Sequence, residues 1–215
     1  NNYSQFSGPW LMSLLGELFP GIAKNQWGSI PQWKNEDRPW ELLSSGESGL
    51  ISQISDYAEG GTFIHPEAII GDFVRIESPC FIGANAEIRH SAFLRKGSWI
   101  CEGAVVGHST EVKNSILLPG SKAPHFNYVG DSIIGIDANL GAGVKLSNVR
   151  NDRREVFVTL NDGERFGSGL SKFGALIGDN SQLGCNVVTN PGTIMAPGTM
   201  IGPNETVGGW VEVKS

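Results

Sequence analysis

Aliphatic side chains recur along this chain at an unbroken spacing of six residues. The first run contains Ile64, Ile70, Ile76, Ile82, Ile88, Leu94, Ile100, Val106, Val112 and Leu118. A small or β-branched residue follows most of them after four positions, as Ala68 and Ala86 do. A period of six fits neither a helix nor simple strand alternation, but it is typical of hexapeptide β-solenoids. In such a solenoid three short strands form one triangular coil, so residues eighteen apart lie above one another.

The same period returns in two later runs, which begin at Ile134 and Ile177. Together the three runs contain roughly nineteen hexads, or about six coils, which is enough for a continuous core. The 29 glycines of the chain suit the tight corners between strands. The sequence therefore predicts an all-β solenoid, a left-handed parallel β-helix with a short N-terminal helical segment.

Residues 1–62 differ from the rest, because they hold four of the six tryptophans and lack the six-residue period. Residues 9–18 predict a short helix that ends before Pro20, and the apolar spacing over residues 50–57 predicts one helical face. We expect this segment to be a helical or irregular cap that flanks the first coil. A lid or a partner-docking surface is the alternative. The β-helix domain is then expected over residues 63–215.

Two segments interrupt the period. Over residues 124–133 the phase of the repeat slips. Residues 151–174 contain alternating apolar positions followed by Asn161-Asp162-Gly163, which predicts a β-hairpin insertion. Insertions in a solenoid project as loops, and the face that carries them commonly binds ligands.

Composition limits the possible partners. The formal net charge is −6, from 16 basic and 22 acidic residues, which argues against nucleic acid as a ligand. Cys80, Cys101 and Cys185 are few and widely spaced, so we expect reduced thiols in a cytoplasmic protein. We find no secretory leader and no apolar run long enough to span a membrane. The chain opens with Asn1 instead of Met, as a trimmed chain or a piece of a longer protein would.

Arg95 and Lys113 are eighteen residues apart and occupy the same hexad position, so the repeat places one above the other. Like charges stacked in this way repel unless an anion lies between them. A phosphate would suit the pair, since arginine binds as a fork and lysine as a point charge. The alternative is two solvated side chains that point apart.

His125 lies in the first interruption, and histidine is a common general base near neutral pH. The alternative is a surface histidine without a chemical role. Asn139 and Asn148 could orient a polar substrate or simply form turns. His90 and His108 are eighteen apart and could hold zinc, but the paired His-x4-His spacing of β-helical zinc hydratases is absent from the sequence. We therefore predict no metal.

Several strings resemble one known family. They are Leu94-Arg95-Lys96-Gly97, Glu111-Val112-Lys113, the run from Gly120 to Asp131 that reads GSKAPHFNYVGD, and Asn139-Leu140-Gly141-Ala142-Gly143. They look like the acetyltransferase domain of the bifunctional glucosamine-1-phosphate acetyltransferase/N-acetylglucosamine-1-phosphate uridyltransferases, over roughly residues 64–208. The insertion at 151–174 resembles the archaeal-type branch. The uridyltransferase domain is absent, Val149 replaces an aromatic residue, and Cys185 replaces a serine.

The resemblance implies a role for each matching residue. His125 matches the catalytic base. The groups that match substrate contacts are Arg95, Lys113, Tyr128, Asn139, Asn148 and Lys172. The groups that match acetyl-CoA contacts are Gly141, Ala142 and Cys185, with backbone N–H groups near Gly141 and Ala142 as candidate oxyanion donors.

The resulting hypothesis is transfer of an acetyl group from acetyl-CoA to an amino-sugar 1-phosphate, with glucosamine 1-phosphate as the first candidate. By resemblance the active unit is a homotrimer with sites between neighbouring solenoids. One alternative is a trimeric module that binds sugar phosphate without catalysis. Another is an acyltransferase that acts on a nucleotide-linked amino sugar.

Overall fold

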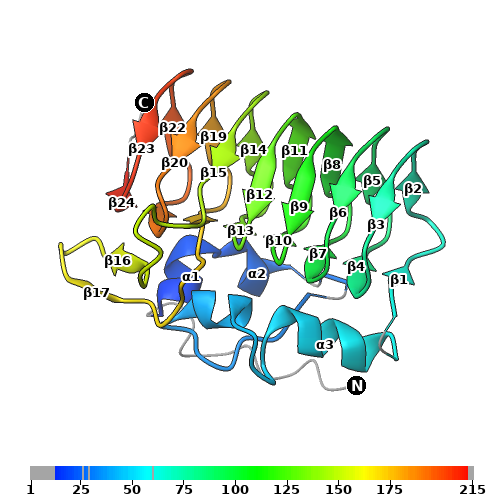
Figure 1. The fold of residues 1–215 in the computed structure, drawn as a ribbon, viewed down its shortest axis with the longest axis horizontal. Coiled ribbons are helices and arrows are strands. Elements are labelled where there is room, and N and C mark those ends of the chain that lie inside the picture. The colour runs from blue at the N-terminus through cyan, green and yellow to red at the C-terminus, as the bar shows by residue number, and fades with distance from the viewer. Residues whose placement is uncertain (1–12, 26, 29, 60, 213–215) are drawn as a thin grey trace.

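The computed structural model describes residues 13–25, 27, 28, 30–59 and 61–212. From residue 63 the chain winds into seven complete coils of three strands, followed by the first strand of an eighth (Figure 1). All strands of the solenoid pair in parallel with the coil before and after. The predicted left-handed parallel β-helix is confirmed, with more coils than the expected six.

Three parallel sheets form the faces of the triangular solenoid. Sheet A consists of β1 (Phe63–Ile64), β4 (Cys80–Ile82), β7 (Ser98–Ile100), β10 (Ile116–Leu117), β13 (Ile133–Ile134), β18 (Ala175–Ile177), β21 (Thr193–Met195) and β24 (Trp210–Val211). Sheet B consists of β2 (Ile69–Ile70), β5 (Glu87–Ile88), β8 (Val105–His108), β11 (Lys122–His125), β14 (Asn139–Leu140), β19 (Gln182–Leu183) and β22 (Met200–Ile201). Sheet C consists of β3 (Arg75–Ile76), β6 (Phe93–Leu94), β9 (Glu111–Lys113), β12 (Tyr128–Gly130), β15 (Lys145–Leu146), β20 (Val188–Thr189) and β23 (Thr206–Val207).

The inward rows of aliphatic and small residues form one continuous core. Ile82, Ile88, Leu94, Ile100, Val106 and Val112 are all fully buried in it. The small residues four positions later, such as Ala86 and Ala104, are buried in the same cluster because they fill the corners of the triangle. The six-residue pattern thus identifies the core residues directly.

The phase of the repeat changes at two corners between sheets C and A. Leu117, and not Leu118, follows Val112 in the inward row, and Ile134 follows Val129 after five positions. At each of these two corners the inward residues are five positions apart instead of six. Equivalent residues of neighbouring coils are therefore seventeen residues apart there. Leu118 packs instead in a second cluster on the outside of sheet A.

The phase slip predicted over residues 124–133 is present between Val129 and Ile134, but these residues do not leave the solenoid. Strands β11 and β12 pair in register with the coils on either side of them, and Ala123 and Val129 lie in the core. The inserted residues 151–174 do leave the solenoid. Strands β16 (Phe157–Thr159) and β17 (Arg165–Gly167) form an antiparallel pair there, and Gly163 has a φ of +86° in the connecting turn.

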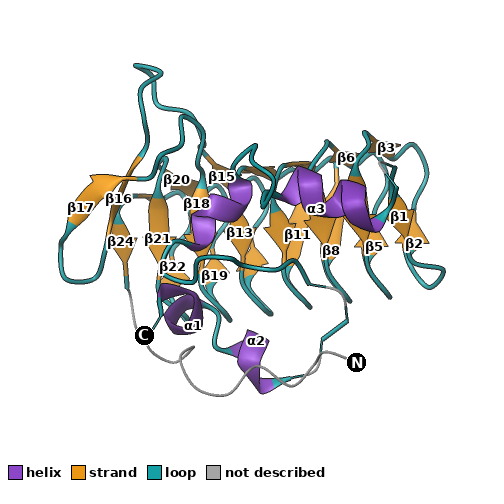
Figure 2. Cartoon of the chain, turned by 90° about the horizontal axis from the view of Figure 1, so that it is seen from below, coloured by secondary structure: helices purple, strands orange, loops and turns teal. Residues whose placement is uncertain are grey.

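The segment before the solenoid lies along the outer face of sheet A (Figures 1 and 2). It contains α1 (Leu14–Leu18), α2 (Gly21–Lys24), the 3-10 helix η2 (Pro39–Leu43) and α3 (Leu50–Tyr57). The outward residues of sheet A are apolar and stack in a column of Phe63, Phe81, Trp99, Ile116, Ile133, Leu176, Ile194 and Trp210. The helices bury this column because an exposed apolar face of that length would otherwise remain in water.

The segment flanks the first coil, where the Tyr57 and Phe63 ring centroids are 5.1 Å apart, and it continues along sheet A beyond that coil. Ile64 and Ile70 point inward in that coil, yet they remain 44% and 39% exposed among the described residues. The short helix predicted over residues 9–18 is present as α1 from Leu14, and the residues before Ser13 lie outside the described part of the chain. The helical face predicted over residues 50–57 is present as α3, with Leu50 and Ile54 fully buried.

Trp40 connects the segment to the inserted hairpin. Its ring is fully buried, and its Nε1 donates to the Ser168 carbonyl at 3.1 Å. The ring also packs against Phe166 and Phe173, with centroids 5.9 and 6.0 Å away. The hairpin is therefore packed on the N-terminal segment along one edge of sheet A. No helix in the described part of the chain has the length and apolar character to cross a membrane.

Asp179 holds the beginning of α2 against the solenoid. One carboxylate oxygen accepts from the Gly21 N–H and the other from the Ile136 N–H, each at 2.8 Å. Burial is the main cause that raises the pKa of Asp179 from 3.8 to about 6, and the two N–H donors oppose that rise.

This raised pKa predicts a pH dependence of stability. A carboxyl group that binds its proton more tightly in the folded state stabilises the protein most below pH 4, and this contribution is lost as the pH rises to about 6. The loss is on the order of 3 kcal/mol. In urea unfolding from pH 4 to 7, the wild type should therefore lose stability relative to Asp179→Asn, which cannot titrate. A constant difference between the two proteins across this range would contradict the prediction.

Candidate functional site

The shortened corners between sheets C and A place four residues in one column. Gly97, Asn114, Asp131 and Asn148 follow one another at intervals of seventeen residues. Gly97, Asn114 and Asp131 have φ values of +81°, +45° and +47°, which asparagine and aspartate tolerate better than most residues. A Cβ atom on Gly97 would lie 2.8 Å from the Asn114 amide oxygen. Glycine is therefore required beneath the polar column.

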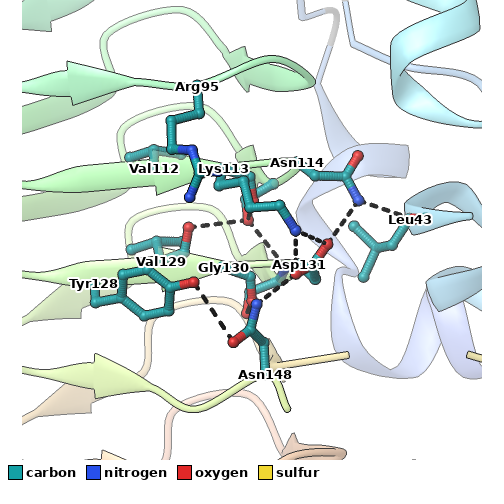
Figure 3. A network of polar contacts seen from close by, with 12 residues as sticks. Leu43, Arg95, Val112, Lys113, Asn114, Tyr128, Val129, Gly130, Asp131 and Asn148 are labelled. Carbon is teal, nitrogen blue, oxygen red and sulfur yellow. Dashed lines mark hydrogen bonds and ion pairs between the residues drawn. The ribbon is translucent and has the colours of Figure 1, made fainter. Parts of the chain in front are cut away.

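Asp131 lies at the centre of this column and is the acceptor for three side chains (Figure 3). The Nζ atom of Lys113 donates to both carboxylate oxygens, at 3.0 and 2.8 Å. The amide of Asn114 donates to one oxygen at 2.9 Å, and the amide of Asn148 donates to the other. The Asp131 side chain is only 3% exposed, and a buried carboxylate needs such partners.

Arg95 lies one coil before Lys113 at the same position, as the period of eighteen predicted. Its guanidinium forms an ion pair with Glu111 at 3.0 Å and lies 3.9 Å from Glu77. The expected repulsion between Arg95 and Lys113 is therefore relieved by carboxylates of the protein itself. The Arg95–Glu111 pair is more than one third exposed on both sides, whereas Lys113 and Asp131 are mostly buried.

Tyr128 lies on the outer face of sheet C, beside Glu111 of the preceding coil. Its hydroxyl is 3.5 Å from the Asn148 side-chain oxygen. Burial is the largest of the causes that raise the pKa of Tyr128 above its ordinary value, so the phenol remains a neutral donor at physiological pH. The Asn148 backbone carbonyl accepts from the Phe173 N–H at 2.9 Å, which places the exposed Lys172 beside the same corner.

The predicted base lies at a different corner, between sheets B and C. His125 ends β11, pairs in register with His108, and is exposed. Ala142 and Cys185 continue the same corner column. At each of these corners, the N–H of the residue that follows the corner residue donates to the backbone carbonyl of the corner residue in the preceding coil. Gly143 donates in this way to His125, and Asn186 donates to Ala142. His125, Ala142 and Cys185 therefore lie in one row along the solenoid.

Asn127 fixes the backbone around His125. Its buried side-chain oxygen accepts from the His125 N–H at 3.0 Å, and its amide donates to the Gly141 carbonyl at 2.8 Å. The Gly141 N–H donates to the Leu183 carbonyl at 2.7 Å and so is not available as an oxyanion donor. Asn139 lies on sheet B, paired between Lys122 and Gln182.

The ten predicted site residues thus divide into two groups within one chain. The first group lies on sheet C and at its corner with sheet A and consists of Arg95, Lys113, Tyr128, Asn148 and Lys172. The second group lies on sheet B and at its corner with sheet C and consists of His125, Asn139, Gly141, Ala142 and Cys185. The strands of sheet C lie between these two groups within one chain, and the expectation of sites between neighbouring solenoids stays a prediction.

The sequence analysis assigned no role to Asn114, Asp131, Glu111 or Asn127. The sequence did carry a signal for Asn114 and Asp131, since they and Asn148 repeat at intervals of seventeen. That signal is visible only when the two shortened corners are known. Asn127 carries no periodic signal, because its role comes from a local bond within the same turn.

The described residues contain no cluster of three histidine, cysteine, aspartate or glutamate side chains that could hold a metal. His90 and His108 stack with ring centroids 5.4 Å apart and an interplanar angle of 29°. The Nδ1 atom of His108 is 3.0 Å from the His90 carbonyl. Metal ligation requires ring nitrogens that converge on a point, and stacked rings do not provide this.

Asn127 offers a test of how the His125 turn is held. Asn127→Ala removes one acceptor and one donor from a buried turn, so we expect a loss of about 1–3 kcal/mol in the free energy of unfolding. Asn151→Ala, at an exposed position of the inserted segment, should change stability by less than about 0.5 kcal/mol. Equal urea midpoints for the two variants would show that the Asn127 bonds do not hold the turn.

Comparison with known proteins agrees with the motifs. A bifunctional sugar-1-phosphate nucleotidylyltransferase/acetyltransferase of Sulfurisphaera tokodaii is 35% identical over 170 residues, which cover 74% of this chain and 42% of that protein. A bifunctional protein GlmU of Methanococcus vannielii is 35% identical over 169 residues, with 74% and 40% covered. This chain thus spans about two fifths of the length of these relatives.

One similar solved structure is the acetyltransferase domain of PglB from Neisseria gonorrhoeae in complex with acetyl coenzyme A. It is 16% identical, has a TM-score of 0.32, and the match covers 86% of this chain and 77% of that one. The family resemblance inferred from the motifs is confirmed by the bifunctional relatives. Residues 76–196, more than half of the chain, match the family described as the GMPPB C-terminal domain, and the chain belongs to that family.

Proposed function

We propose that this chain transfers an acetyl group from acetyl-CoA to the amine of an amino-sugar 1-phosphate, with glucosamine 1-phosphate as the first candidate. The observation that carries the proposal is the corner where Arg95 and Lys113 stack beside the neutral phenol of Tyr128 and the fixed amide of Asn148. A sugar phosphate needs cations for the phosphate and neutral donors and acceptors for its hydroxyls, and this corner offers both. The bifunctional relatives support the same reaction class.

The two cations would act differently on a phosphate. The Arg95–Glu111 pair is partly exposed, and such pairs contribute only about 0–1 kcal/mol, so a phosphate can recruit the guanidinium at little cost. Lys113 remains fixed on Asp131 and offers its remaining N–H. Glu111, once released from Arg95, is an acceptor for the donors of the sugar.

A complete site requires a second copy of the chain. His125 lies at another corner of its own solenoid, so the imidazole that reaches the sugar at Arg95 and Lys113 belongs to a neighbouring subunit. Three solenoids around a threefold axis would repeat this contact and close the assembly. Phe126, next to His125, supports an interface at this corner, because an aromatic residue with a φ of +53° is 57% exposed there.

In the proposed reaction His125 removes the proton from the amine as the nitrogen attacks the thioester carbonyl of acetyl-CoA. The thiolate of CoA then leaves, and the amide of the product remains. The Ala142 N–H is the candidate donor to the oxyanion, since the Gly141 N–H is already bonded. Contacts to the distant phosphate hold the amine for attack.

The alternatives differ in what they require of an assay. A module that binds without catalysis would release no thiol from acetyl-CoA with any amino-sugar phosphate. An acyltransferase for nucleotide-linked sugars would turn over UDP-linked amino sugar faster than glucosamine 1-phosphate. A thiol-release assay with both acceptors and a panel of hexosamine phosphates separates these cases.

His125→Ala tests the assignment of the base. We expect kcat to fall by at least about 10²-fold, because the amine would lose its proton acceptor. His65→Ala is the matched control, since His65 is a partly exposed histidine of the first coil, and it should retain wild-type turnover. Unchanged turnover in His125→Ala would remove this residue from the mechanism.

Mixed oligomers test the shared site. Co-expressed His125→Ala and Arg95→Ala chains should recover roughly a quarter of wild-type activity, because each mixed trimer contains one site with both residues intact. Each variant alone should be inactive or nearly so. If each site lay within one chain, mixing would recover no activity.

A further inference from the structure

We propose that Asp131 is a positioning residue for acetyl transfer, and that the N-terminal segment sets its position through Asn114 and the Leu43 carbonyl. The inference rests on the proposed function and adds to it the residues that hold the substrate groups in place. The sequence analysis assigned no role to Asp131, Asn114 or Leu43.

The first step is the convergence of site residues on one carboxylate. Lys113 donates to both oxygens of Asp131, and Asn148 donates to one of them. Because the Asn148 amide nitrogen is held in this way, its oxygen points to the Tyr128 hydroxyl at 3.5 Å. One buried carboxylate therefore orients the ammonium, the amide and, through the amide, the phenol (Figure 3).

The second step is the link to the N-terminal segment. The amide nitrogen of Asn114 donates both to Asp131, at 2.9 Å, and to the Leu43 carbonyl, at 2.8 Å. Leu43 is the last residue of η2, which also contains the fully buried Trp40. An amide nitrogen has two hydrogens, so these two bonds use both of them. The Asn114 side chain thus has one orientation, and it connects the helical segment to the site.

The third step is the burial of these contacts. Asn114 is 8% exposed and Asp131 only 2% exposed as whole residues, so water cannot readily replace a lost partner. The ring packing of Trp40 against Phe166 and Phe173 fixes η2 from its other side. The segment is therefore expected to influence substrate binding although it contributes no side chain to the substrate contacts.

Asn114→Gly is the most direct test, because glycine keeps the φ of +45° and removes only the amide. We expect the KM for the sugar phosphate to rise about tenfold, while the KM for acetyl-CoA stays within about twofold, since only the Lys113 side of the site loosens. Asn85→Gly is the matched control, because Asn85 is an exposed corner asparagine with a φ of +53°. It should leave both constants unchanged.

Asp131→Asn separates positioning from simple electrostatics. If Asp131 only repelled the phosphate, removing its charge would lower the KM for the sugar phosphate. Positioning predicts a higher KM, because a single amide oxygen cannot accept from Lys113, Asn114 and Asn148 together. A lowered KM in Asp131→Asn, or an unchanged KM in Asn114→Gly, overturns the proposal.

A second measurement does not depend on catalysis. Backbone hydrogen exchange in peptides that cover residues 39–49 should become faster in Asn114→Gly than in Asn85→Gly, because η2 loses its bond to the solenoid. Equal exchange in the two variants overturns the structural link. A wild type that turns over no amino-sugar phosphate overturns the proposed function instead, and the exchange result then still decides whether the link exists.

Discussion

The stacking of inward side chains from one coil to the next is the constraint on which the rest of the structure depends. Each coil has the same three faces, so a residue's place in the repeat decides whether it is buried, outward or at a corner. A single residue removed from a corner leaves the core intact and shifts every outward position after it. Two such removals bring Asn114 beneath Asp131 and Asp131 beneath Asn148. The polar network at the site is thus a consequence of how the solenoid turns.

The outer face of sheet A explains why helices cover one side of the solenoid. Parallel sheets in which both faces are apolar require cover on the outside as well as on the inside. Sheets B and C carry polar residues such as Glu87 and Glu111 on their outer faces, and they need no such cover. The helices on sheet A therefore complete a second core, and the bond from Asn114 to Leu43 connects that core to the site.

The sequence was sufficient for the parts of the structure that follow a period. The fold class, the stacking of Arg95 on Lys113, and the stacking of His90 on His108 can all be read from spacings of eighteen. The positions of the shortened corners could not be read, because Leu117 and Leu118 are both leucine and either would suit the core. Sequence alone also could not show which sheet the helices cover, since this depends on outward residues whose side is known only once the coils are in register.

The division of the candidate residues between two corners follows from the same geometry. Tyr128 begins β12 only three positions after His125, yet its hydroxyl lies 3.5 Å from the Asn148 side-chain oxygen, at the other end of the sheet C strands. Residues on one row can approach a ligand together, whereas residues on two different rows of one solenoid point away from each other. A substrate held at Arg95 can therefore meet His125 only if the solenoid of another subunit presents the corner that carries His125. Under the proposed function, the separation of the two groups favours a symmetric assembly, because every subunit then offers both.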